Sequence, residues 1–151
     1  MTSWAEFAAA EEDFAHRVRA LFTTRKHLTV ATLRRDGSPR ISGTELEFAD
    51  GEVWLGMMPG SLKALDLRRD PRLALHSPTV DPPDDLPSAW SGEAKLAGRA
   101  VEVSDPGRRD EPHRFRVDLA EVVLTRVEES GDHLVIESWH PGRGLERRLR
   151  R

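Results

Sequence analysis

The stretch GSLKALDLRRDPR, residues 60–72, directly follows an apolar run at residues 53–58 and predicts a strand, a tight turn and a short helix. Ser61 is suited to cap that helix, and Pro71 ends it because the residue before a proline is forced out of the helical region. The free N–H groups of the helix start and the ammonium group of Lys63 together favour an anion. The alternative is an ordinary capped helix with a solvated lysine.

The rest of the chain predicts a set of antiparallel strands. Residues 27–33, 40–48 and 52–58 are β-forming, and the Asp-Gly pairs at 36–37 and 50–51 indicate hairpin turns between them. Four further strands are predicted at 73–76, 92–103, 115–127 and 133–139. Seven short strands without alternating helices indicate a mainly β protein, a small antiparallel barrel of six to seven strands.

Helices are predicted at the N-terminus and after the third strand. Ser3 and Glu6 form a capping-box pattern at the start of an amphipathic helix that runs to about Leu21, within an N-terminal region of residues 1–24. We expect the whole chain, residues 1–151, to form a single domain. Three segments are predicted to be irregular: the loop at 79–89, the polar connection at 104–112 and the basic tail at 140–151.

Composition excludes several classes of function. The 151 residues include no cysteine, so disulfides, zinc–thiolate sites, iron–sulfur clusters and thiol nucleophiles are excluded. The six histidines lack metal-ligand spacing, and the serine-hydrolase, P-loop and dinucleotide-binding motifs are absent. A formal charge of −3 argues against a nucleic-acid partner, and no apolar run is long enough to span a membrane. The sequence thus identifies neither a metal site nor a catalytic side chain, and we expect a cytoplasmic protein.

The order of these pieces resembles a known family. The segments ATLRRDGSPR at residues 31–40, DGEVWLG at 50–56 and the stretch at 60–72 follow one another as in the pyridoxamine 5′-phosphate oxidase-like superfamily. The resemblance is clear over residues 25–103 and looser as far as Trp139. It implies an FMN-binding split barrel that forms a homodimer with the cofactor at the interface. Some members of the superfamily use the deazaflavin coenzyme F-420 instead of FMN.

The resemblance also implies which residues contact the cofactor. In the family a Ser-x-Lys turn holds the cofactor phosphate, which implies that role for Ser61 and Lys63, on either side of Leu62. The partner subunit's C-terminal strand closes the site, and Trp139 and Arg143 are the candidates there, with a structural role as the alternative. The implied contacts with the flavin, each with a place in the barrel core as its alternative, are Ser42, Gly43, Thr44, Leu55, Gly56, Met57 and Met58.

The implied activity is hydride transfer between bound FMN and an unidentified small organic substrate. Leu62 replaces an arginine of authentic pyridoxamine phosphate oxidases, and their substrate-binding C-terminal segment has no full match here, so we do not expect vitamin B6 oxidation. One alternative is a deazaflavin-dependent reductase, whose acidic cofactor tail would suit a basic groove formed by Arg68, Arg69 and Arg72. The others are a non-enzymatic flavin carrier or sensor, and a basic tail that binds nucleic acid or a protein partner.

Overall fold

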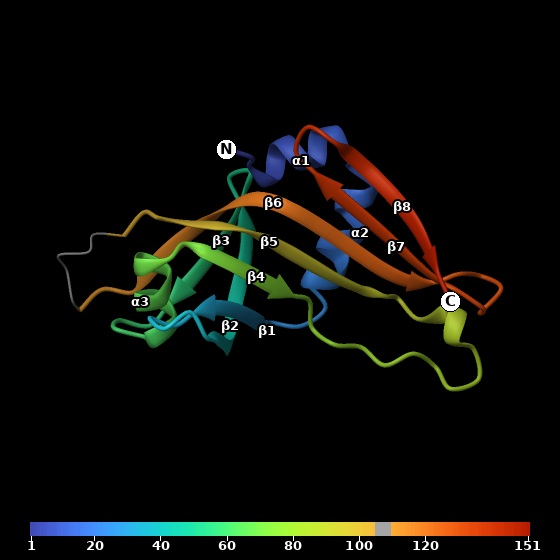
Figure 1. The fold of residues 1–151 in the computed structure, drawn as a ribbon, viewed down its shortest axis with the longest axis horizontal. Helices are drawn as coiled ribbons and strands as arrows, with labels where there is room; N and C mark the ends of the chain where they lie inside the picture. The colour runs from blue at the N-terminus through green and yellow to red at the C-terminus, as the bar shows by residue number, and fades with distance from the viewer. Residues whose placement is uncertain (105–109) are drawn as a thin grey trace.

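The computed structural model describes residues 1–104 and 110–151 and shows a mainly β protein (Figure 1). Strands account for more of the described chain than helices do. The strands are β1 (His27–Leu33), β2 (Pro39–Ala49), β3 (Glu52–Met57), β4 (Arg72–His76), β5 (Glu93–Glu102), β6 (His113–Val127), β7 (Leu134–His140) and β8 (Gly144–Arg150).

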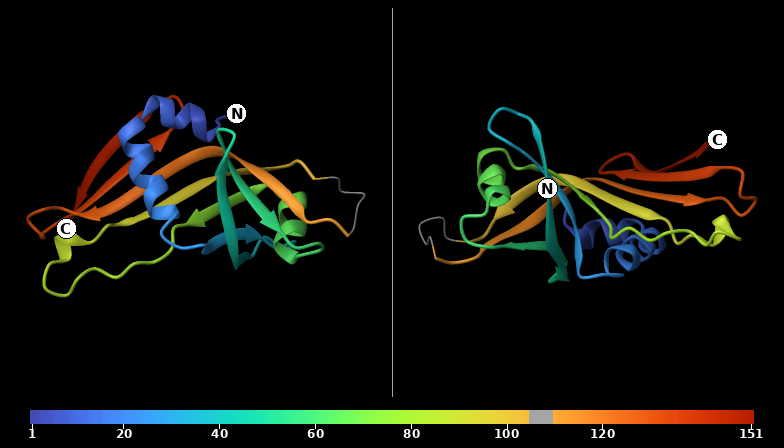
Figure 2. Two further views of the ribbon diagram at one scale, coloured as in Figure 1. Left: turned by 180° about the vertical axis from the view of Figure 1, so that it is seen from behind. Right: turned by 90° about the horizontal axis from the view of Figure 1, so that it is seen from below.

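These strands form one antiparallel sheet that closes on itself. Its order is β3-β2-β1-β4-β5-β6-β7-β8, and β3 also pairs with β6, so the six strands β1 to β6 make a closed barrel. The last two strands extend the sheet beyond the barrel, as the views in Figure 2 show. The predicted antiparallel barrel of six to seven strands is confirmed, with an additional strand at its C-terminal edge.

The longest strand, β6, belongs to both parts of the sheet. Its first half pairs with β3 and its second half with β7, while β5 accompanies it along most of its length. The register of β5 against β6 shifts between Ala97 and Gly98. A Cβ atom at Gly98 would lie 2.0 Å from the carbonyl oxygen of Asp118, so only glycine allows this close approach of the two strands.

Both hairpins predicted from Asp-Gly pairs are present. The backbone of Asp50 and that of Gly51 both have positive φ, 53° and 74°, as a tight turn between antiparallel strands requires. In the other hairpin, Gly37 has φ of +84° and the side chain of Asp36 accepts a hydrogen bond from the N–H of Ser38 at 2.9 Å. These turns set the order β1-β2-β3 at the start of the barrel.

The N-terminal segment differs from the predicted single helix. It forms α1 (Trp4–Ala10) and α2 (Glu12–Phe22), which are separated at Glu11 by a non-helical backbone. The Ser3 hydroxyl accepts the N–H of Glu6 at 3.1 Å, so the predicted N-cap is confirmed. The prediction of one helix is wrong because the two halves pack on different strands, α1 against β3 and α2 against β5.

The C-terminal tail was predicted to be irregular, and this prediction is wrong. Pro141 to Arg143 form a turn, and β8 then pairs with β7 from His140↔Gly144 to Leu134↔Arg150. Gly142 and Gly144 have positive φ, which allows the chain to reverse. Arginine side chains dominate β8, as is common for an exposed edge strand, where charge discourages pairing with further strands.

The remaining segments, a short helix and a long loop, lie at opposite ends of the molecule. The short helix α3 (Leu62–Arg69) covers one end of the barrel, and the predicted loop at 79–89, with one 3₁₀ turn η1 (Pro87–Ala89), runs to the opposite end (Figures 1 and 2). Of the predicted connection at 104–112, residues 105–109 lie outside the described residues. Within the described parts of the chain, no helix has both the length and the apolar character needed to cross a membrane.

Candidate functional site

The turn between β3 and α3 has the geometry expected from the sequence. The N–H of Ser61 donates to the carbonyl of Met58 at 3.1 Å and closes the turn. Gly60 has φ of +70°, in the left-handed region that favours glycine. The helix then runs from Leu62 to Arg69 and ends before Pro71, as predicted. The chain therefore presents the N-terminus of a helix directly after a sharp bend.

The hydroxyl of Ser61 does not cap this helix, contrary to expectation. Ser61 occupies the N-cap position, but its side chain makes no capping hydrogen bond. Its Oγ atom is shielded from solvent and has no hydrogen-bond partner. A buried hydroxyl without a partner is unfavourable in a folded protein, so a missing ligand is a common explanation. The first N–H groups of the helix also lack partners within the helix.

Lys63 connects the helix to the second strand. Its Nζ atom donates a hydrogen bond of 2.7 Å to the carbonyl of Gly43, which lies near the middle of β2. The ammonium group is thereby held between α3 and β2, within the same turn as Ser61. The structure thus brings Ser61, Leu62, Lys63, Gly43 and the preceding Met58 together at one end of the barrel.

The predicted flavin contacts in β2 and β3 divide between the two faces of the sheet. The side chains of Thr44, Leu55 and Met57 are buried. Gly43, Gly56 and Met58 are exposed, Ser42 is half-buried, and a Cβ atom at either glycine would meet nothing within 4 Å. The outer surface of these strands is therefore open at the two glycines, where a ligand can approach the main chain, and Gly56 lines a pocket of about 450 Å³.

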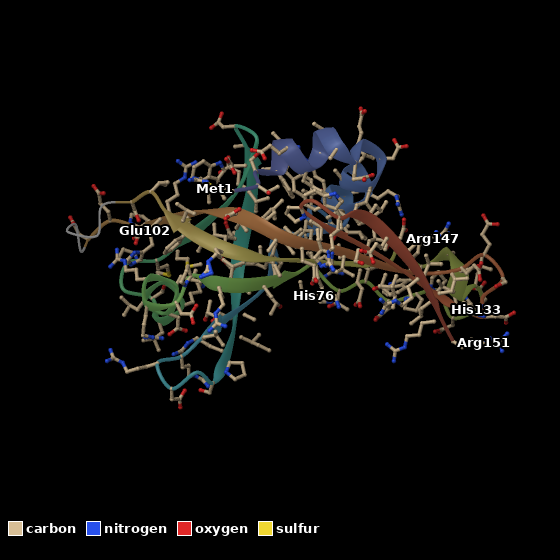
Figure 3. All side chains as sticks on the ribbon, turned by 45° about the horizontal axis from the view of Figure 1, so that its top comes forward. Met1, His76, Glu102, His133, Arg147 and Arg151 are labelled. Carbon is tan, nitrogen blue, oxygen red and sulfur yellow. The ribbon has the colours of Figure 1, made fainter. Side chains whose placement is uncertain are left out.

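Trp139 and Arg143 lie far from this turn within one chain. Trp139 is the last residue but one of β7, is only 5% exposed and packs against Phe7 of α1 with 4.8 Å between ring centroids. Arg143 is exposed in the turn that leads into β8. Figure 3 shows Glu102 at the α3 end of the molecule and Arg147 and Arg151 of β8 toward the other end. The turn that joins β7 to β8 lies beside α1 and away from α3 in Figure 1, so a single chain does not bring Trp139 or Arg143 to Ser61.

A buried carboxylate beside the turn was not anticipated from the sequence. Asp66, on α3, accepts hydrogen bonds from Thr32 at 2.8 Å, Arg40 at 2.7 Å and Arg69 at 2.9 Å. Burial by itself raises the pKa of this carboxyl, but the hydrogen bonds from Arg40, Thr32 and Arg69 outweigh it and hold the pKa below its ordinary value. The sequence signal was an acidic residue between the buried Ala64 and Leu67.

His113 at the start of β6 is a second residue that the sequence did not suggest. It is buried, and its Nε2 atom accepts the N–H of Gly60 at 3.0 Å. Glu102 of β5 lies beside it and binds Arg68 of α3 through two oxygens. The bond from Arg68, together with those from Ser104 and His113, lowers the pKa of Glu102 to about 2 despite burial. The sequence did contain one signal: side chains alternate between the two faces of a strand, and His113 is two residues from Phe115, so both side chains point to the buried face.

An arginine-lined pocket of about 860 Å³ lies between α3 and the hairpin that joins β1 to β2. We call it the arginine pocket; its lining residues are Arg34, Arg35, Asp36, Arg40, Leu62, Leu65, Asp66 and Arg69. Of the three arginines considered from the sequence for a basic groove, only Arg69 lines it. Arg68 pairs with Glu102 and Arg72 with Asp70. The pocket adjoins the Ser61 turn, because Leu62 belongs to both.

Solved structures with the same fold include proteins of several kinds. PhzG from Burkholderia lata, solved with tetrahydrophenazine-1-carboxylic acid, is 11% identical over 97% of this chain and 92% of its own, with a TM-score of 0.65. A pyridoxamine 5′-phosphate oxidase-related, FMN-binding protein from Nostoc punctiforme is 12% identical over 99% and 100%, with a TM-score of 0.62. A heme-binding protein from Mycobacterium smegmatis is 18% identical over 88% and 56%, with a TM-score of 0.57. At these identities the similarity establishes the fold alone.

The sequence itself matches one family model. Residues 14–137 match the model described as pyridoxamine 5′-phosphate oxidase, which spans most of the barrel and β7. A comparison with curated proteins found no match. The matched region includes the β3–α3 turn with Ser61 and Lys63. This chain belongs to the pyridoxamine 5′-phosphate oxidase-like family of FMN-binding split barrels.

Proposed function

We propose that this protein binds FMN with its phosphate at the Ser61 turn and acts as a flavin-dependent oxidoreductase on a small organic substrate. The observation that carries the proposal is the buried, unpartnered hydroxyl of Ser61 at a helix N-terminus, in the same turn as the ammonium group of Lys63. Both groups, and the free N–H groups of the helix, suit a phosphate dianion. Membership of an FMN-binding family supports the choice of ligand.

The chain's own contribution would be to bind and orient the cofactor. Ser61 and Lys63 would hold the phosphate, and the open main chain at Gly43 and Gly56 would take the flat ring. Bound FMN would supply the redox chemistry by accepting or donating a hydride. The role of the protein would then be to position the ring and limit solvent access, which agrees with a chain in which we identify no catalytic side chain.

The proposal includes a homodimer that places the cofactor between two copies. Several large apolar side chains around the turn are exposed, with exposed fractions of 75% for Ile41, 79% for Met58 and 60% for Leu62. Exposed apolar side chains gathered in one region are typical of a surface that another protein covers. A second copy would cover them and bring its own exposed Arg143 toward the Ser61 turn, whereas Trp139 is buried within its own chain and is given the structural role.

A second candidate cofactor is the deazaflavin coenzyme F-420, and one observation favours it. The arginine pocket begins at Leu62, next to the proposed phosphate site, and four of its eight lining residues are arginines against two aspartates. Such a surface suits an acidic extension of the cofactor, which FMN does not have. The two cofactors share the phosphate site in this proposal and differ in whether the arginine pocket is used.

Titration of the purified protein with each cofactor, followed by absorbance and fluorescence, tests this proposal. Saturable binding of FMN supports it, and tighter binding of F-420 that weakens in Arg34→Ala and Arg35→Ala variants supports the second cofactor. Reduction of the bound flavin by a chemical donor, but by no organic substrate tested, would favour a carrier or sensor over an enzyme. Failure to bind either cofactor contradicts the proposal.

A further inference from the structure

The N–H of Gly60 is held by a histidine from a distant part of the chain. Gly60 precedes Ser61, and its N–H donates to Nε2 of His113 at 3.0 Å. His113 begins β6 and pairs in register with Met57, the last residue of β3. The ring is only 6% exposed, so water does not compete freely for this bond. The position of the turn that carries Ser61 therefore depends on the ring of His113.

The hydrogen bonds around the ring require one particular tautomer. A neutral imidazole carries a single N–H, and because Nε2 accepts a hydrogen bond from the N–H of Gly60, the ring's own N–H is on Nδ1. Nδ1 lies 3.4 Å from Oε1 of Glu102, within reach of a carboxylate that remains ionised because its pKa is lowered to about 2. The Nη2 atom of Arg68 also lies 3.1 Å from Nδ1 and can only donate, so it opposes a proton on Nδ1, whereas Glu102 favours one.

Protonation of the ring would remove the bond to Gly60. The imidazolium carries an N–H on both nitrogens, so Nε2–H would face the N–H of Gly60, donor against donor. Glu102 from β5 and Arg68 from α3 face the ring and act on its charge in opposite directions. The pocket that His113 lines also holds Glu45 and Glu47 from β2 and Arg114 from β6. Phe115, two residues along β6, stacks beside the ring with 6.4 Å between centroids.

We propose that His113 is a positioning residue for the anion site at the Ser61 turn, which it holds through Gly60 only while its ring is neutral. The carboxylate of Glu102, which can accept the N–H of Nδ1, favours the tautomer that accepts the Gly60 N–H. Affinity for the phosphate-bearing ligand then falls when the ring is protonated. The effect on ligand affinity rests on the proposed function. The effect of His113 on the position of the Ser61 turn does not depend on it.

Nuclear magnetic resonance of the ligand-free wild-type protein tests the turn directly. At neutral pH we expect the ring nitrogens of His113 to report a proton on Nδ1. As the pH is lowered, the amide resonance of Gly60 should shift together with the ring of His113, and its hydrogen exchange should become faster than that of other amides near the turn. A proton on Nε2 at neutral pH, or a Gly60 amide that does not respond to the ring, contradicts the proposal.

Titration with FMN between pH 5.5 and 8 tests the effect on binding. His113→Gln retains an acceptor for Gly60 but does not change charge, so it should bind FMN nearly as tightly as wild type at pH 8 and keep only the pH dependence that the phosphate itself contributes, since a phosphate monoester titrates near pH 6. His113→Phe keeps a ring but no acceptor and should bind roughly two- to ten-fold more weakly at pH 8. His16→Gln, on the exposed face of α2, is the control and should match wild type.

The outcomes separate the two proposals. An equal pH dependence in wild type and His113→Gln contradicts a role of His113 in binding. A wild-type protein that binds no FMN at any pH contradicts the proposed function, and the Gly60 resonance then decides the positioning of the turn by itself.

Discussion

The Nζ atom of Lys63 lies 2.7 Å from the main-chain carbonyl oxygen of Gly43 and donates a hydrogen bond to it. This contact ties the first turn of α3 to β2, which the ion pair of Arg40 with Asp66 joins at a second point. It brings the glycine-containing part of β2 next to the turn that carries Ser61. Ser61 and Lys63, the proposed contacts of the cofactor phosphate, thus lie next to Gly43, a proposed contact of the flavin ring.

Ser61→Ala should separate binding from stability. Because the Ser61 hydroxyl has no partner in the fold, its removal should leave the free energy of unfolding nearly unchanged. If it binds the cofactor phosphate, FMN affinity should fall by about 1.5–3 kcal/mol, or roughly ten- to a hundred-fold. Urea denaturation and FMN titration measure the two effects.

Ser3→Ala is the matched control for that variant. The Ser3 hydroxyl does cap its helix, accepting the N–H of Glu6 at 3.1 Å. Its loss should therefore destabilise the protein by about 1 kcal/mol and leave FMN affinity unchanged. The reverse pattern, with Ser61→Ala destabilised and still binding FMN normally, would show that Ser61 has only a structural role.

Asp66→Asn should be strongly destabilising. The carboxylate is buried and balances the guanidinium groups of Arg40 and Arg69, which are themselves only partly exposed. Removing its charge leaves both without their counter-ion, and we expect a loss of about 2–4 kcal/mol in the free energy of unfolding. Asp70→Asn breaks the exposed pair with Arg72 and should change stability little in the same denaturation experiment.

Acid should weaken the attachment of α3 to β5. The pKa of Glu102 is lowered from 4.5 to about 2 by Arg68, so its ionised form contributes its full stabilisation above about pH 4.5 and loses it as the pH falls toward 2. Glu102→Gln should therefore lose less stability than wild type on going from neutral pH to pH 3. Denaturation with urea at several pH values measures this, with the exposed Glu129→Gln expected to follow wild type. Parallel curves for Glu102→Gln and wild type would contradict it.

Mixed dimers should restore cofactor binding if two chains build each site. In the proposed homodimer a site uses Lys63 of one chain and Arg143 of the other, so Lys63→Ala and Arg143→Ala should each weaken FMN binding. A heterodimer of the two variants has one site with both residues intact. Refolding the variants together should therefore recover tight binding at one site in each heterodimer. No recovery, in a mixture shown to contain heterodimers, would place the two residues outside a shared site.

The parts of the fold that depend on local signals were predictable from the sequence. The Asp-Gly pairs set the hairpins between β1, β2 and β3, and Ser61 and Pro71 set the limits of α3. In contrast, β8 is held by its pairing with β7, and arginine-rich sequence on an exposed edge looks like a solvated tail. The break at Glu11 likewise follows from the different strands on which α1 and α2 pack.

The site was predictable only where one short segment builds it. Ser61 and Lys63 lie in a single turn, so their spacing was sufficient to suggest an anion site. The residues that support that turn come from other elements: Thr32 from β1, Arg40 from β2, Glu102 from β5 and His113 from β6. Their partners depend on the closure of the barrel, which no local pattern contains.

The most direct test of the central claim is the FMN affinity of Lys63→Ala beside that of Lys26→Ala, an exposed lysine at the start of the barrel. If the Ser61 turn binds the cofactor phosphate, wild type and Lys26→Ala should bind FMN alike and Lys63→Ala at least about ten-fold more weakly. Equal affinity of all three proteins for FMN would contradict the assignment of the phosphate to this turn.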